Sequence, residues 1–131
     1  MRYKGMKGRA WEEMRIYIVE RDGKKCSTCP RTAAKGYQMQ AGHYQPVGLV
    51  GSNNTLSWDE LNVHCQCAYC NGMGQGEQEK MGQYISRTYG EEIRLKLVGR
   101  RYKIDPVKNW EAVRDHYKKK RLALKSEINY E

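Results

Sequence analysis

Hydrophobic residues recur at helical spacing in three stretches of this chain. The first stretch is residues 9–22, where Trp11, Met14 and Ile18 lie three and then four positions apart and so share one face of a helix. The segment before it, residues 1–8, is basic and contains glycine, so we expect a loose arm there. The pattern predicts that the ordered part of the chain begins with this amphipathic helix.

Two further helices are predicted toward the C-terminus. Residues 77–89 form the second, with an apolar face made of Met81, Tyr84 and Ile85. The third is expected over 106–125, because Asp105 and Pro106 are favourable residues for a helix start. Its apolar stripe would consist of Trp110, Val113, Tyr117 and Leu124. The intervening residues 91–98 are predicted as a short helix or a strand.

The middle of the chain has a different pattern, which predicts two short strands. Residues 37–44 alternate loosely between polar and apolar, and residues 61–65 form a second short run. Between them, residues 45–57 are rich in glycine and asparagine, which indicates a loop that Trp58 would anchor. The predicted fold class is therefore α+β, a small core around a long-looped hairpin with flanking helices at both ends.

Two Cys-x-x-Cys pairs enclose this hairpin. Two residues between thiolates let both sulfurs reach one metal ion, so the pairs predict a four-cysteine zinc site made of Cys26, Cys29, Cys67 and Cys70. A fifth thiol, Cys65, could replace Cys67, although its spacing is a poorer match. Such a site is structural, because protein ligands fill all four positions. It would also compensate for the modest core of a 131-residue chain.

The charge balance favours a polyanionic partner. Lys and Arg number 24 against 15 Asp and Glu, a net charge of +9, which points to nucleic acid. The candidate DNA-binding residues are the densest basic runs, although each run alone could be a solvated face: Arg100, Arg101, Lys103, Lys118, Lys119, Lys120 and Arg121. No apolar run approaches the ~18 residues of a membrane span, and the N-terminus lacks a signal-peptide core. A cytoplasmic setting follows, in which thiols stay reduced.

The order of these motifs resembles the zinc-bearing HNH (ββα-metal) endonucleases. The matching features are Arg-Asp-Gly at 21–23 before the first cysteine pair, Gly-His-Tyr at 42–44, and Asn62 nine residues before Asn71. More narrowly, the run from Asn62 to Asn71 is similar to the NinG (Rap) recombination proteins of lambdoid phages. This resemblance implies an HNH-like zinc nuclease core at residues 9–90 and a basic helical extension at 91–131 packed on it.

The resemblance also implies roles for individual residues. His43 would be the general base, and Asn62 would hold the hairpin loop and so orient it. Asn71 would bind a catalytic Mg²⁺ or Mn²⁺. His64 is not part of the family pattern; it lies two residues after Asn62, so on a strand both side chains point to one face, and we expect it to act as a substitute ligand or phosphate contact. Each residue has a plainer alternative: a packed or phosphate-binding strand histidine, a turn asparagine, a helix N-cap and a partly exposed strand histidine respectively.

One departure from the family pattern concerns the catalytic metal. Many HNH enzymes carry an Asp or His ligand where this chain has Gly42. The leading hypothesis is still a structure-specific endonuclease, phage- or prophage-encoded, that cleaves D-loops or Holliday junctions in a bacterial host cell. The alternatives are a sequence-selective HNH nickase or restriction-type enzyme, and a non-catalytic zinc-stabilised DNA-binding module. A homodimer and recombination proteins are candidate partners, although no dimer interface can be read from the sequence.

Overall fold

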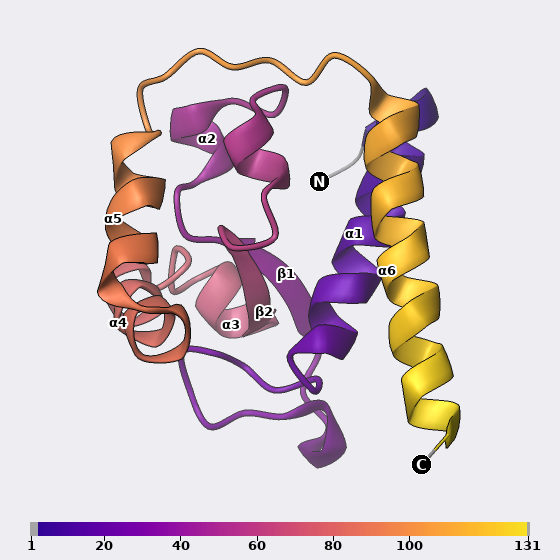
Figure 1. Cartoon of the computed structure of the whole chain (residues 1–131). Coiled ribbons are helices and arrows are strands. Elements are labelled where there is room, and N and C mark those ends of the chain that lie inside the picture. Colours follow the sequence, from indigo (N-terminus) through magenta and orange to yellow (C-terminus); the bar gives the residue numbers. More distant parts are fainter. Residues whose placement is uncertain (1–2, 131) are drawn as a thin grey trace.

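The fold is a two-stranded hairpin placed between two pairs of helices. The computed structural model describes residues 3–130, and the side chains of residues 3–127. In Figure 1, α1 (Gly5–Arg21) and α6 (Trp110–Tyr130) lie side by side on the right, whereas α4 (Gln78–Tyr89) and α5 (Glu91–Gly99) lie on the left. The short elements are α2 (Val47–Val50), α3 (Ala68–Asn71), η1 (Ala33–Lys35) and η2 (Thr55–Trp58). This arrangement confirms the predicted α+β class.

The hairpin consists of β1 (Met39–His43) and β2 (Val63–Cys67), which pair antiparallel. Gly42 lies opposite His64, and His43 lies opposite Val63. The second strand begins two residues later than predicted, since Asp59 forms a turn in front of it. The backbone nitrogens of Leu61 and Asn62 donate to the Asp59 side chain and carbonyl, both at 2.9 Å.

The first helix begins at Gly5, so the prediction of a loose arm over 1–8 was wrong for residues 5–8. An aromatic anchor explains the difference: the Tyr3 ring lies 6.4 Å from Trp11 and 5.9 Å from Trp58. Residues 1–2 of the expected arm lie outside the described part. The face of α1 predicted to be apolar is buried, with Met14 and Ile18 fully enclosed.

The last helix begins at Trp110 rather than at 106. The residues expected to start the helix pair instead with the loop before η2. The Val107 nitrogen donates to the Asn53 carbonyl at 2.7 Å, and Pro106 forms an isolated β-bridge with Asn54. Asn109 caps the helix instead, accepting from the Ala112 nitrogen at 3.0 Å. Residues 91–98 were predicted to be either a short helix or a strand. They form a helix, α5 (Glu91–Gly99).

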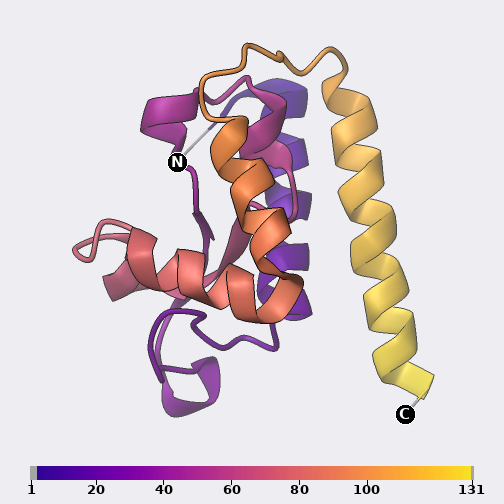
Figure 2. The ribbon, with the colours of Figure 1, turned by 60° about the vertical axis from the view of Figure 1, so that its left-hand side comes forward.

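Helices α1 and α6 run in the same direction and close the main core. Lys7 contacts the Trp110 ring near their first turns, and Tyr17 contacts Tyr117 further along. Figure 2 shows α6 at the edge of the molecule, where it packs on α1, and the Lys120–Glu60 ion pair joins it to the turn before β2. In the described part of the chain, no helix combines the length and the apolarity that crossing a membrane requires.

We expect the Tyr117→Phe substitution to lower the free energy of unfolding by about 1–2 kcal/mol, since it removes a buried hydrogen bond. The Tyr117 hydroxyl donates to the Trp58 carbonyl and so ties α6 to η2. Urea denaturation measures the change. Tyr102→Phe is the matched control. The Tyr102 side chain is 81% exposed, so loss of its hydroxyl should leave the urea midpoint unchanged.

Candidate functional site

The two cysteine pairs meet in space as the sequence predicts. The four sulfurs of Cys26, Cys29, Cys67 and Cys70 all lie within 4.8 Å of one another. The Cys29 and Cys67 sulfurs are 3.6 Å apart, close to the ~3.8 Å expected for sulfurs that are each 2.3 Å from a tetrahedral ion. These residues form a site that can hold a structural metal such as zinc.

The surroundings of the cluster suit thiolate ligands. Backbone nitrogens point at the sulfurs, from Arg31 to Cys29 at 3.5 Å and from Cys70 to Cys67 at 3.4 Å. Burial raises the pKa of the Cys70 thiol to about 12, and its cysteine neighbours add to the shift. Such a thiol does not ionise by itself at neutral pH, whereas a divalent cation would take it as a thiolate.

The fifth cysteine is not part of this cluster. Cys65 is fully buried, and burial raises its pKa to about 12. Its backbone carbonyl accepts hydrogen bonds from Ser27, from the nitrogen at 2.9 Å and from the hydroxyl at 2.8 Å. The structure therefore selects Cys67 over Cys65 as the partner of Cys70.

His43 ends strand β1 in a buried position with 9% of its surface exposed. Its ring stacks on Trp11 of α1, with centroids 5.6 Å apart. The Nε2 atom lies 2.8 Å from the Ser57 carbonyl, which can only accept, so Nε2 carries the proton and Nδ1 keeps its lone pair. Burial lowers the pKa of His43 to about 4, against the opposing effect of this hydrogen bond, and keeps the ring neutral at pH 7.

Asn62 holds the loop that leads away from His43. Its side-chain oxygen accepts from the Gln45 nitrogen at 2.8 Å, and its amide donates to the carbonyls of Gln45 and Leu56 at 3.2 and 3.1 Å. Leu56 directly precedes Ser57, the acceptor for His43. Asn62 thus positions the imidazole through the loop, and it is itself fully buried.

His64 does not lie beside His43. Neighbouring residues of a strand face opposite sides, and His64 is opposite Gly42 rather than His43. Its Nε2 donates to the Leu61 carbonyl at 2.7 Å and its Nδ1 accepts from Arg21 at 2.9 Å. Both ring nitrogens are engaged inside the protein. His64 therefore has protein partners on both nitrogens, and its role as a substitute metal ligand or phosphate contact stays a prediction.

Asn71, at the end of α3, comes close to Gly42. A Cβ built on Gly42 would lie 3.0 Å from the Asn71 Oδ1 atom and only 1.9 Å from Oε1 of Gln66. Asn71 and Trp11 also line a cleft of about 550 Å³ between α1 and β1. Sequence patterns give Gln66 no role, and its only signal is its position directly before Cys67.

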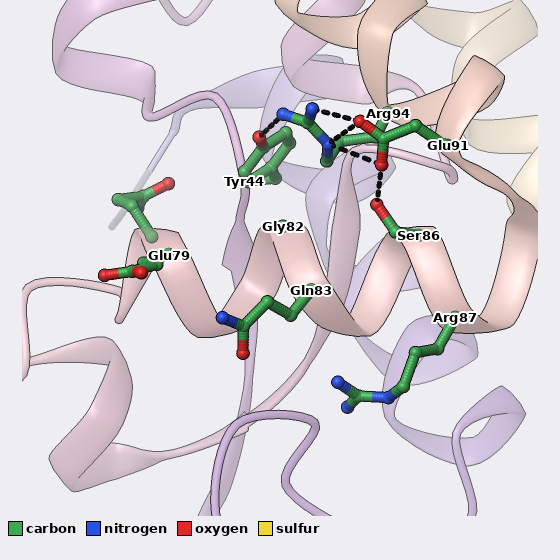
Figure 3. Close-up of a pocket in the computed structure, with 9 residues that line it drawn as sticks. Tyr44, Glu79, Gly82, Gln83, Ser86, Arg87, Glu91 and Arg94 are labelled. Carbon is green, nitrogen blue, oxygen red and sulfur yellow. Dashed lines mark hydrogen bonds and ion pairs between the residues drawn. The ribbon is translucent and has the colours of Figure 1, made fainter.

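A second hollow lies along α4, beside the residue that follows His43. Figure 3 shows Tyr44 over Gly82, with Arg94 joining the Tyr44 hydroxyl to Glu91. A Cβ on Gly82 would come within 3.0 Å of that hydroxyl, so glycine is needed for this contact. None of the predicted site residues lines this hollow. The contact secures the end of β1 against α4.

The predicted DNA-binding residues differ in whether their side chains have partners within the protein. Three of the seven form ion pairs within the protein at 2.6–2.7 Å: Arg100 with Asp59, Lys120 with Glu60 and Arg121 with Glu13. Arg101 donates to Gln45 at 2.6 Å. The side chains of the other three are exposed and have no hydrogen bond or ion pair with the described residues: Lys103, Lys118 and Lys119.

The fold and the cysteine cluster together define a small α+β protein with a four-cysteine cluster that can hold a metal ion. Comparison with protein-family models matches residues 5–129 to the family described as bacteriophage lambda NinG protein. The match spans almost the whole chain, so the chain belongs to the NinG family of phage proteins. Searches of curated proteins and of solved structures found no significant match.

Metal analysis of the purified protein is expected to find one zinc ion per chain. Cys67→Ser should abolish stoichiometric zinc and destabilise the fold, because it removes one of four ligands. Cys65→Ala is the matched control and should keep the zinc, since Cys65 lies outside the cluster. Loss of zinc from the Cys65 variant, with retention in the Cys67 variant, would contradict the assignment.

The free energy of unfolding should fall as pH drops from 6.5 toward 4. Burial lowers the pKa of both His43 and His64 to about 4 in the folded protein, so the unfolded chain binds more protons in this window. Each histidine contributes up to about 1.4 kcal/mol per pH unit. Urea midpoints between pH 5 and 7.5 measure the slope of the unfolding free energy against pH. His64→Gln should reduce this slope by the contribution of one histidine. An unchanged slope in that variant would contradict the prediction.

Proposed function

We propose that this protein is an HNH-type, metal-dependent endonuclease that cleaves branched DNA in the bacterial host cell. The observation that carries the proposal is the support of His43: Asn62 fixes the loop, and the loop carbonyl of Ser57 fixes the imidazole tautomer at 2.8 Å. With its proton on Nε2, the imidazole keeps a lone pair on Nδ1 that can accept a proton. Membership of the NinG family adds the phage context.

The chemistry follows from that tautomer. Nδ1 of His43 would accept the proton of the attacking water, while Nε2 stays bonded to Ser57 and keeps the ring in place. Asn71 offers an amide oxygen, a donor that suits Mg²⁺ or Mn²⁺. Such an ion, when bound, neutralises negative charge on the departing oxygen. Trp11 stacks on one face of the ring and so holds its plane, in which Nδ1 lies.

The DNA would be held by charge rather than by base readout. The exposed side chains of Lys103, Lys118 and Lys119 are suited to phosphate contacts, which position a duplex without reading its sequence. This favours recognition of a branched shape over recognition of a sequence. A non-catalytic DNA-binding module is the second candidate, favoured by Gly42 in a ligand position and by the burial of His43.

Cleavage assays with a labelled four-way junction, a D-loop and a matched linear duplex test the proposal. We expect Mg²⁺- or Mn²⁺-dependent cutting of the branched substrates, and a rate about 10²–10⁴-fold lower for His43→Ala, the range typical of a lost general base. His116→Ala is the matched control, because His116 is an exposed histidine on α6.

Each alternative outcome has a definite meaning. Equal cutting of the linear duplex would replace branch specificity with a general or sequence-selective HNH activity. Junction binding without cutting, in wild type as in His43→Ala, would leave the non-catalytic module. Full activity in His43→Ala would remove His43 from the mechanism.

A further inference from the structure

The space that a side chain at position 42 would fill is taken by the side chain of Gln66. A Cβ on Gly42 would meet Oε1 of Gln66 at 1.9 Å and its Cδ at 2.8 Å, distances that no side chain could tolerate without displacing Gln66. The absence of a side chain at 42 therefore makes room for the Gln66 amide. Gln66 fills the space in which related enzymes carry an Asp or His.

The orientation of the Gln66 amide is set by its surroundings. Its Nε2 donates to the Gly76 carbonyl at 2.7 Å, and to the Thr28 hydroxyl at 3.1 Å. Because a carbonyl only accepts, the nitrogen must face Gly76, and the oxygen must face Gly42. Gln66 is fully buried, and its Oε1 has no hydrogen-bond partner among the described residues. A buried acceptor without a donor is unfavourable unless something else approaches it.

Asn71 directs a second amide oxygen to the same place. Its Nδ2 donates to Oε1 of Gln40 at 2.9 Å, and its Oδ1 lies 3.0 Å from the Cβ position of Gly42. The Gln66 and Asn71 oxygens thus converge on one point from β2 and α3. Two acceptors that face one another repel, whereas a cation between them would be attracted to both.

We propose that Gln66 replaces the ligand missing at Gly42, and that its Oε1 atom together with Oδ1 of Asn71 binds one divalent cation. Amide oxygens are hard ligands that suit Mg²⁺ and Mn²⁺. Both ligands are neutral, so affinity is weak in the free protein and increases when a DNA phosphate supplies negative charge. The inference deepens the proposed function and rests on it for what the cation does.

Paramagnetic broadening by Mn²⁺ tests the site in the unaltered zinc-loaded protein. In a ¹⁵N-labelled sample, the side-chain amide signals of Gln66 and Asn71 should broaden first and recover with excess Mg²⁺. Asn109, at the far end of the molecule where α6 begins, is the internal control and should stay sharp. A Gln66 signal that persists while other signals broaden would overturn the proposal.

A ligand exchange between positions 66 and 42 tests the same site by substitution. Gln66→Ala should weaken Mn²⁺ binding by at least about tenfold, a loss reached even when a residue that only supports a ligand is removed. Adding Gly42→Asp to Gln66→Ala relieves the 1.9 Å clash and places a carboxylate at the site. The double variant should bind Mn²⁺ at least as tightly as wild type. Zinc content and thermal unfolding report whether each variant is folded.

The outcomes separate this inference from the proposed function. Mn²⁺ binding at Gln66 without DNA cleavage would support the cation site and refute the nuclease. Metal-dependent cleavage with unchanged Mn²⁺ affinity in a folded Gln66→Ala variant would refute the site alone. Should Gln66→Ala fail to fold, the broadening in wild type decides.

Discussion

The link between the two cysteine pairs is the constraint on which the rest of this structure depends. Cys29 and Cys67 are 38 positions apart, yet their sulfurs are 3.6 Å from one another. The segment between them contains both strands and the loop that Asn62 holds. A two-stranded hairpin is marginally stable by itself, so a metal held by the four cysteines would fix its register. That register decides whether Gly42 lies opposite His64 and therefore which side chains share each face.

The two faces of the hairpin have different tasks. One face packs Ala41 and Val63 against α1 and completes the apolar core. The other face is polar although it is buried, and its groups are satisfied by named partners: His64 by Arg21 and Leu61, the Gln66 amide by Gly76 and Thr28. Enclosing so many polar groups is costly unless they are paired. The unpaired oxygen of Gln66 is conspicuous for this reason.

Local features of the sequence predicted much of this structure. Cys-x-x-Cys spacing and helical periodicity depend on neighbours within a few residues, so the cysteine cluster and the buried face of α1 could be read directly. The late start of α6 could not, since it depends on Val107 bonding to Asn53. The face on which His64 lies could not be read from its spacing to Asn62, because Asn62 lies before the strand. The role of Gln66 depends on the absent side chain of Gly42, a relation that spacing does not express.

The parallel pairing of α1 with α6 also bears on how the chain folds as it is made. The first helix is synthesised well before α6, the helix that covers its outer face. Until then, Tyr17 lacks Tyr117, and Glu13 lacks Arg121. The hairpin and its four cysteines, complete by residue 70, can assemble against the inner face of α1 well before that. The outer layer can therefore close only after α6 has been made, and a chain that stops before α6 leaves the outer face of α1 uncovered.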